Sequence, residues 1–457
     1  MIIKREIYLK KLRPLYDNNL IKVILGPRRS GKSEILKMIR NELYSLGIND
    51  DHVIYINFED VSFEELLDYR MLNSYVNNLV KDKNKYYLMF DEIQHVNEFE
   101  KVIASFKATL NCSIFITGSN SNLLKGSLAS LLTGRYLEFY VRPFTYKESL
   151  DYLTSLGKEI PNDFFERNYL KWGGFPQRFD FADELQLRQY LNQLYLDTIE
   201  KDIINMSRRD KKKSNLDKNK FKTISSYVLA TAGQEFSPSS IEEYLHKEKG
   251  DLNITANTIR TYLELMEKAF LIQRIDRYSI KGKRKLKMLP KYYALDNGMR
   301  VIQNNSGAYL STFFLENIIC NELLSRGYEV SVGKKYNGEI DFVVEQGGKH
   351  CYIQVAYYLT KEKGPDEKKS AFDREYDAFD SIKDGSPRYV MSLDKIDTSH
   401  NGIIHLNIED FLLNIVVLVS CRVLYRKMYC FVQGKFYGTM EKTKPGGTAG
   451  IEGGTCP

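Results

Sequence analysis

Gly26-Pro27-Arg28-Arg29-Ser30-Gly31-Lys32-Ser33 is the stretch that decides the fold of the N-terminal part of this chain. The apolar run Ile21–Leu25 precedes it and a helical pattern follows it, which predicts the order strand, glycine-rich loop, helix. This is the spacing of a phosphate-binding P-loop. The two glycines let successive backbone N–H groups point at one anion, and the dipole of the following helix adds positive potential. We expect a nucleotide to bind here through its phosphates.

Two side chains of the loop have specific expected roles. Lys32 would reach the β- and γ-phosphates, and the hydroxyl of Ser33 would ligate Mg²⁺. Arg28 and Arg29 fill the variable middle of the loop, where contact with the nucleotide and exposure to solvent are both open alternatives. The residues expected to bind the nucleotide are Gly26, Pro27, Arg28, Arg29, Ser30, Gly31, Lys32 and Ser33.

A pair of acidic residues follows a predicted buried strand further along the chain. The apolar run Tyr86–Phe90 is typical of a buried parallel strand, and it ends in Asp91 and Glu92. Beside a P-loop, Asp91 would hold Mg²⁺, mostly through water, and Glu92 would polarise the attacking water. The alternating segment His52–Phe58 predicts another strand of the same sheet.

Two more strands are predicted, Ser113–Thr117 and Leu137–Val141, and each has a candidate functional residue beside it. Ser119, with Asn120, could sense the γ-phosphate or position the water; an ordinary turn cap is the alternative. Arg135 could stabilise transition-state charge in a neighbouring subunit, which would require a homo-oligomer. A surface ion pair is the alternative for Arg135. The catalytic candidates are therefore Lys32, Glu92, Ser119 and Arg135.

Together these segments resemble the AAA-type P-loop ATPases of prokaryotes, in particular the subgroup that carries a C-terminal domain long described as of unknown function. The matching motifs are GPRRSGKS, LMFDEIQHV, IFITGSNSNLL, LTGRY and PFTYKESL, in the family's order from Arg5 to about Leu150. Gln94 completes the family's DEIQ pattern. The resemblance implies that ATP, rather than GTP, is the nucleotide and that a small helical lid covers it.

The segment from Asp151 to Asn205 is expected to form this lid, since it is mostly helical in pattern and contains the family's GGFP turn at Gly173–Pro176. The basic run Arg208–Lys222 follows. We expect it to be a solvated linker, and contact with phosphates is the alternative.

A helix-turn-helix pattern comes next. Ser237 and Pro238 predict a helix start, with a capping box between Ser239 and Glu242, and Thr255 or Asn257 predicts the start of a second helix. The predicted strands Leu271–Ile275 and Lys291–Leu295 flank the basic run Lys281–Lys287. Two helices and a basic hairpin make a winged helix, similar to the family's middle domain.

The winged helix raises duplex DNA as a partner. Thr258, Arg260 and Thr261 on the second helix could face a major groove, with the basic hairpin on phosphates. Packing between the subunits of an ATPase is the alternative role.

The C-terminal part resembles the restriction-endonuclease-like fold. Phe314–Leu324 predicts a helix carrying Glu316, and Glu339–Val344 with His350–Tyr357 predicts a hairpin. Asp341 matches the first acid of a metal-dependent nuclease. Gln354-Val355-Ala356 stands where that fold has acid-x-lysine, so we expect a binding or structural role instead of nuclease activity.

The expected fold class is α/β: a P-loop NTPase parallel sheet with a helical lid, then a winged helix, then a small α/β restriction-endonuclease-like domain. The expected boundaries are 1–150 for the ATPase domain, 151–215 for the lid and linker, 216–300 for the winged helix, 301–413 for the endonuclease-like domain, and 414–457 for an extra segment with a disordered Gly/Pro-rich tail.

Composition sets the cellular context. The chain has 457 residues, and its 66 basic and 59 acidic side chains leave a net charge of only +7, so a nucleic-acid face depends on local clusters. The six cysteines show no metal-type pairing, and no signal peptide precedes them, which indicates reduced thiols in the cytoplasm. The apolar stretch Phe411–Leu424 is too short and interrupted to span a bilayer, so we expect no membrane partner and a buried helix or strand there.

The leading functional hypothesis is a Mg²⁺-dependent ATPase whose nucleotide state repositions the lid and winged helix. The alternative is a nucleotide-gated switch that binds DNA or protein with little turnover.

Overall fold

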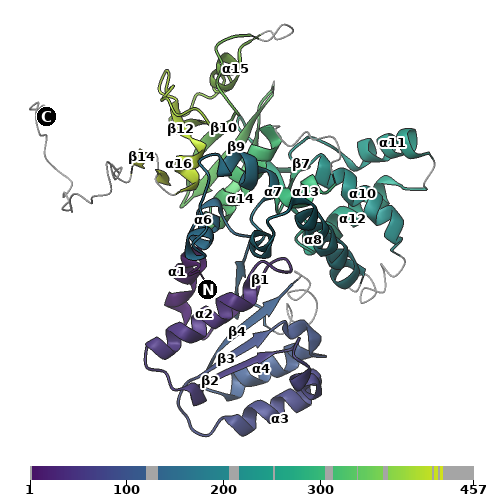
Figure 1. The fold of residues 1–457 in the computed structure, drawn as a ribbon, viewed down its shortest axis with the longest axis vertical. Helices are drawn as coiled ribbons and strands as arrows, with labels where there is room; N and C mark the ends of the chain where they lie inside the picture. The colour runs from purple at the N-terminus through teal and green to yellow at the C-terminus, as the bar shows by residue number, and fades with distance from the viewer. Residues whose placement is uncertain are drawn as a thin grey trace, which may run out of the picture.

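The computed structural model describes residues 3–119, 132–204, 216–250, 253–303, 312–336, 338–363, 369–413, 416–419 and 422–425. Its N-terminal part is a five-stranded sheet in the order β2-β3-β4-β1-β5, parallel throughout (Figure 1). The strands are β1 (Ile21–Leu25), β2 (Val53–Asn57), β3 (Tyr86–Asp91), β4 (Cys112–Gly118) and β5 (Tyr136–Tyr140). All five predicted strands are confirmed to within one residue at each end.

Helices cover both faces of this sheet (Figure 1). Helices α1 (Glu6–Leu12) and α2 (Lys32–Ser45) pack on one face, and α3 (Tyr69–Leu79) and α4 (Phe99–Thr109) pack on the other. A sheet covered on both sides needs strands that are apolar on both sides, and β1, β3 and β4 are buried along their whole length. The carboxyl ends of these three strands lie at one edge of the sheet, where the candidate residues follow.

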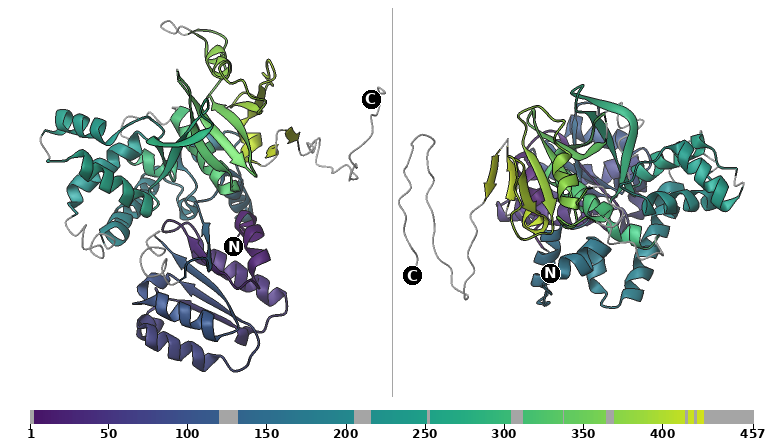
Figure 2. Two further views of the ribbon diagram at one scale, coloured as in Figure 1. Left: turned by 180° about the vertical axis from the view of Figure 1, so that it is seen from behind. Right: turned by 90° about the horizontal axis from the view of Figure 1, so that it is seen from above.

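A mostly helical segment comes next. Its helices are α6 (Tyr146–Ser155), η6 (Phe165–Tyr169), α7 (Leu170–Trp172), η7 (Pro176–Asp180), α8 (Glu184–Asp197), η8 (Thr198–Ile204), α10 (Lys218–Ala230), α11 (Pro238–Lys249) and α12 (Ala256–Lys268). Thr255 caps α12, as predicted, by accepting a hydrogen bond from the Thr258 N–H. Figure 2 shows α10–α12 to one side of the C-terminal sheet.

The capping box of α11 is not the one expected. Ser237 and Ser240 form it, instead of Ser239 and Glu242, because the helix begins directly after Ser237 and the third helical position is therefore Ser240. The carboxylate of Glu242 accepts from the Ala256 N–H at 2.9 Å and so joins α11 to the start of α12.

The C-terminal part is built on a seven-stranded mixed sheet in the order β12-β11-β10-β9-β8-β6-β7. Its strands are β6 (Ile272–Ser279), β7 (Arg284–Ala294), β8 (Glu329–Lys334), β9 (Glu339–Gln346), β10 (Lys349–Val355), β11 (Arg388–Ser392) and β12 (Ile404–Asn407). Its helices are α13 (Asn297–Val301), α14 (Thr312–Arg326), α15 (Ala371–Asp377) and α16 (Ile408–Leu412), and a small ladder of β13 (Val416–Val419) and β14 (Arg422–Tyr425) follows.

The basic hairpin is longer than its sequence pattern indicates. β6 and β7 extend well beyond the predicted strands Leu271–Ile275 and Lys291–Leu295, so that much of the run Lys281–Lys287 belongs to β7 instead of the turn. β6 also pairs with β8 over Arg277–Ser279. The hairpin is therefore the edge of the C-terminal sheet as well as the end of the helical segment.

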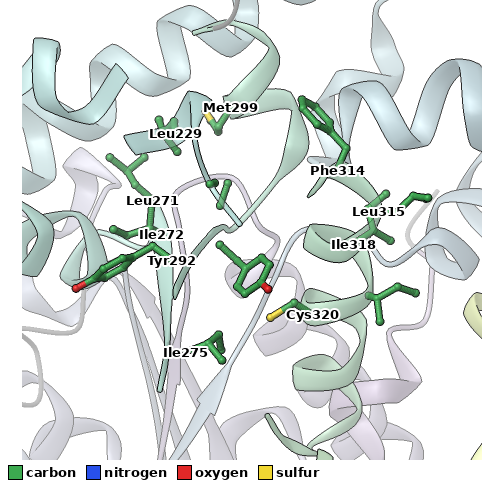
Figure 3. Close-up of a cluster of buried hydrophobic side chains, with 14 of the residues drawn as sticks. Leu229, Leu271, Ile272, Ile275, Tyr292, Met299, Phe314, Leu315, Ile318 and Cys320 are labelled. Atoms are coloured by element: carbon green, nitrogen blue, oxygen red, sulfur yellow. The ribbon is translucent and has the colours of Figure 1, made fainter. Parts of the chain in front are cut away.

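One hydrophobic core joins the helical segment to the C-terminal sheet. The buried cluster runs from Phe144 to Leu418, and Figure 3 shows side chains of α10, β6, β7, α13 and α14 meeting in it. The N-terminal sheet has separate clusters on its two faces. The described residues on both sides of the expected boundary at 300 thus share a core, and the division of this part into separate domains remains a prediction.

Asp296 connects the glycine turn Gly173–Pro176 of the predicted lid to this core through hydrogen bonds. Its two carboxylate oxygens accept hydrogen bonds from the N–H groups of Gly174 at 2.7 Å and Gly298 at 2.8 Å. A Cβ at Gly173, where φ is 67°, would lie 2.1 Å from Asp296 Oδ1, so only glycine fits there. Burial raises the pKa of Asp296 to about 6, although the two N–H groups act in the opposite direction.

This shift predicts a pH dependence of stability. Between its ordinary pKa and about 6, Asp296 binds more protons in the folded chain than in the unfolded one, so stability falls as the pH rises through that range. The contribution is about 3 kcal/mol, because each pKa unit corresponds to about 1.4 kcal/mol. We expect Asp296→Asn to have a lower free energy of unfolding than the wild type, because one of the two N–H groups loses its acceptor. The variant should not show the fall in stability with rising pH. Urea unfolding from pH 4 to 7 measures this: a wild-type-to-variant difference that stays constant with pH would contradict it.

Several expectations lie outside the described residues: the first part of the basic run, 208–215, Asn120 and the Gly/Pro-rich tail 442–457; Lys218, Lys220 and Lys222 of the same run lie in α10. Cys112 and Cys320 are buried free thiols. Within the described ranges, no helix is both long and apolar enough to cross a membrane.

Candidate nucleotide site

The loop between β1 and α2 has a backbone that requires glycine at two positions. Gly26 has φ 155°, and a Cβ there would lie 2.1 Å from the carbonyl oxygen of Val141. Gly31 has φ 94° and is the residue before α2, whose first turn no side chain caps. The N–H groups at that helix end are thus left for an anion.

Two buried polar groups in the loop fit a phosphate. The hydroxyl oxygen of Ser30 is fully buried and has no hydrogen-bond partner among the described residues. The side chain of Lys32 is only 4% exposed, and its Nζ donates to the carbonyl oxygen of Pro27 at 3.1 Å. A buried ammonium group needs negative charge nearby, so the donor set of this loop suits an anionic ligand.

The acidic pair lies against the loop. Glu92 Oε1 is 3.4 Å from Lys32 Nζ, and both side chains are buried. Asp91 accepts from the hydroxyls of Thr117 at 2.5 Å and Tyr55 at 3.1 Å. The sequence prediction that the loop and the acidic pair meet at one edge of the sheet agrees with these contacts.

Thr117, at the end of β4, was not a sequence candidate, yet it positions both acids. Its hydroxyl donates to Asp91 and accepts from the backbone N–H of Glu92 at 2.8 Å. Glu92 has φ 52°, which is unusual for a residue with a side chain. Strain of this kind persists where neighbouring contacts fix the backbone, and here Thr117 fixes it.

Glu92 is held in its charged form. Burial alone would raise its pKa, but the charge of Lys32 and a hydrogen bond from the Gln94 side chain outweigh burial, and the pKa of Glu92 is lowered. Gln94 Nε2 also lies 3.5 Å from Ser119 Oγ. The glutamine of the DEIQ pattern therefore links two of the candidate residues.

Arg28 and Ser119 meet at a third acid that the sequence did not reveal. Asp202 of η8 accepts from Arg28 Nε at 2.8 Å, from Arg28 Nη2 at 3.0 Å and from Ser119 Oγ at 3.0 Å. Its side chain is 2% exposed. Arg28 also lies 3.7 Å from Glu59. Of the alternatives for Arg28, exposure to solvent does not hold, because the guanidinium is bound in this ion pair.

Arg5 is a third residue, after Thr117 and Asp202, whose role only the structure reveals. It is buried, donates to the carbonyl oxygen of Ser30 at 2.8 Å and pairs with Glu148 at 2.8 Å. It also donates to the carbonyl oxygens of Arg142 and Pro143. Arg5 thus fastens the phosphate-loop backbone to the start of α6.

The other candidates are two more loop residues and Arg135. Ser33 is half-buried in the first turn of α2, and Arg29 is exposed with φ 62°. Arg135 is exposed and precedes β5, at the amino edge of the sheet, whereas the loop follows β1 at the carboxyl edge. Five residues of strand, about 16 Å, separate the two edges. Arg135 therefore has no access to the nucleotide site of its own subunit.

A cluster of acidic side chains in the C-terminal part lines a cavity, and Gln354 links two of them. A cavity of about 700 Å³ is lined by Glu316, Asp341, Gln354 and Glu375 among others. Gln354 accepts from the Asp341 N–H and donates to Glu375, both at 2.8 Å. Burial and neighbouring carboxylates raise the pKa of Glu316 to about 7 and that of Asp341 well above its ordinary value. In the part of the chain that the structure describes, no group of three or more acids, histidines or cysteines is arranged to hold a metal ion.

Two family models match the chain. Residues 18–150 match an AAA domain, and residues 165–308 match a domain of unknown function. The first match covers the sheet, the phosphate loop and the acidic pair.

Relatives that align with more than three quarters of this chain occur in a bacterium and an archaeon. An uncharacterized protein of Haemophilus influenzae is 35% identical over 361 residues, which are 78% of this chain and 88% of that protein. An uncharacterized protein of Methanocaldococcus jannaschii is 29% identical, over 79% of this chain and 78% of that one. Among solved structures, the Orc1 protein of Aeropyrum pernix in complex with DNA overlaps 67% of this chain and 93% of that chain at 13% identity. Its TM-score of 0.28 is too low to support a conclusion about this chain.

Proposed function

The chain belongs to the same family as the uncharacterized Haemophilus influenzae protein and has an AAA domain at its N-terminal end, and from this premise we propose that it is a Mg²⁺-dependent ATPase. The observation that carries the proposal is the contact between the phosphate loop and the acidic pair, with Lys32 Nζ 3.4 Å from Glu92 Oε1. A cation for phosphate and a carboxylate for water are the two groups that phosphoryl transfer to water needs.

Each candidate residue has a proposed task. The N–H groups at the start of α2, with Lys32 and the Ser30 hydroxyl, bind the phosphates of ATP. Ser33 and Asp91 hold Mg²⁺, which supplies positive charge to the phosphate oxygens. Tyr55 and Thr117 orient the Asp91 carboxylate for this task.

Glu92 accepts a proton from the attacking water. Its lowered pKa keeps it ionised at neutral pH, and its hydrogen bond from Gln94 fixes one oxygen while the other faces Lys32. Ser119 is placed to position the same water or a phosphate oxygen. Arg135 acts only across an interface between two copies of this chain, because it lies at the far edge of its own sheet.

Isothermal titration of the full chain with ATP and Mg²⁺, followed by assay of phosphate release, tests the proposal. We expect one site per chain and turnover that stops when Mg²⁺ is chelated. A chain that gives no heat with ATP would rule the proposal out.

The hairpin supports a second candidate, a nucleotide-gated DNA binder. Helices α10–α12 and hairpin β6–β7 follow the element order of a winged helix, and we propose that they form one. Lys281, Lys283 and Arg284 are exposed near the tip of the hairpin, whereas Lys285 is paired with Glu329. The tip of the hairpin therefore offers fewer unpaired positive charges than the sequence of the basic run Lys281–Lys287 indicates.

If this hairpin contacts duplex DNA, replacing Lys281, Lys283 and Arg284 by serine will weaken gel-shift binding. The slope of log K against log salt should become shallower by about 2–3, because each lost phosphate contact removes about 0.9. The control is a double variant at the exposed Lys10 and Lys83, which belong to the N-terminal part of the chain. No retardation of wild type at low salt would reject DNA binding. For the C-terminal part we propose a structural or binding role.

A further inference from the structure

Asp202 occupies two donors that a phosphate could use: Arg28, a residue expected from the sequence to be able to contact the nucleotide, and Ser119, which the proposed function assigns to the water or a phosphate oxygen. It comes from η8, far along the chain from the phosphate loop, yet its carboxylate lies between Arg28 of the loop and Ser119 at the end of β4. A carboxylate and a phosphate oxygen accept the same hydrogen bonds from a guanidinium and a hydroxyl. The two anions therefore compete for one set of partners.

The charges around Asp202 make its buried position depend on Arg28 and Ser119. Burial raises the pKa of Asp202 above its ordinary value, while Arg28 and Ser119 oppose the rise and the nearby charge of Glu92 adds to it. A buried carboxylate that loses its cation is strongly destabilised where it is. Asp202 is thus held in the site only while Arg28 and Ser119 are available to it.

The helix that carries Asp202 is joined to the middle helices. η8 continues α8 directly, with the wider turn of a π-helix, a local form that occurs often at functional sites. Glu200 of η8 pairs with Lys218 of α10, and Tyr195 of α8 hydrogen-bonds Ser225 of α10 at 2.6 Å. A displacement of η8 would therefore act directly on α10.

We propose that Asp202 is an internal competitor of the γ-phosphate: it holds Arg28 and Ser119 until ATP displaces it, and its release moves η8 and α10. This inference rests on the proposed ATPase function and adds the way in which the site reports its occupancy. ADP, which lacks the competing phosphate, leaves the Asp202 contacts in place. A ligand shifts such an equilibrium only through its different affinity for the two states, and here that difference is the γ-phosphate.

The first test is equilibrium binding of Mg²⁺ with a non-hydrolysable ATP analogue or with ADP to the full chain. Asp202→Asn keeps the size of the side chain and removes its charge. We expect the variant to bind the ATP analogue about tenfold more tightly and to change ADP binding less than about twofold. Asp197→Asn is the control, because it removes a charge of the same helical segment, and Asp197 contacts Gln193 of α8 and Lys201 of η8 instead of the phosphate loop.

The second test uses the wild-type chain and needs no variant. Hydrogen exchange of the backbone amides in 198–204 and 218–225 should accelerate with the ATP analogue and not with ADP. Unchanged exchange in these segments, or equal tightening of both nucleotides in Asp202→Asn, would overturn the inference and leave the ATPase proposal standing. If the wild-type chain bound neither nucleotide, the inference and the ATPase proposal would both be ruled out.

Discussion

Replacing Lys32 by alanine will weaken ATP binding at least about a hundredfold and abolish hydrolysis by this chain. Lys32 is buried and supplies the ammonium group of the phosphate loop. Charge-assisted hydrogen bonds contribute about 1.5–3 kcal/mol each. Losing two of them weakens binding by about 10²–10⁴-fold, since 1.4 kcal/mol is a factor of ten. Calorimetric titration and phosphate release measure the two effects.

The variant needs a folding control, because it leaves Glu92 buried without its cation. Circular dichroism and thermal unfolding show whether the N-terminal sheet is intact. Lys37→Ala is the matched control: Lys37 lies on the same helix and pairs with Glu34 at 2.7 Å, away from the loop. Binding by a folded Lys32→Ala chain at wild-type affinity would show that the nucleotide site lies elsewhere.

Replacing Glu92 by glutamine should separate binding from turnover. Glutamine keeps an oxygen that can accept from Gln94, so the loop and ATP affinity should change little. It cannot take a proton from water, and loss of a general base lowers the rate by about 10²–10⁴-fold. Single-turnover hydrolysis and binding of ATP to the same preparation give the two numbers.

Glu98→Gln is the control for this variant, because Glu98 lies on the surface and pairs with Lys101. Normal hydrolysis by Glu92→Gln would show that another group activates the water. If turnover stops as expected, the variant holds ATP, and purification of the ATP-bound chain followed by mass measurement gives its oligomeric state and any partner that co-purifies.

Local pattern is sufficient to predict the N-terminal sheet and to bring the phosphate loop and the acidic pair of the candidate site together. Buried parallel strands are continuous apolar runs, and β1, β3 and β4 each end in residues whose chemistry differs sharply from the strand. The acidic pair and the phosphate loop could be placed together because parallel strands end at the same edge. The spacing of the two motifs along the chain is therefore enough to predict that they lie close together.

The remaining contacts could not be predicted because they join distant segments. Arg28 and Asp202 are 174 residues apart, and Arg5 and Glu148 are 143 apart. A single charged residue in a helix has no signal that distinguishes a buried ion pair from a solvated surface. The sequence does not single out Thr117, because threonine is ordinary in strands, and only its two hydrogen bonds reveal its role.

The pairing of β6 with β8 has a consequence for how this protein can be cut and recombined. A fragment ending at residue 300 would leave the outer edge of β6 without its neighbour and the core around Phe314 open. Such unpaired edges and exposed apolar surfaces promote aggregation. Helices α10–α12 are therefore not expected to fold when they are expressed alone. A soluble expression fragment has to begin near Phe144 and continue through β12.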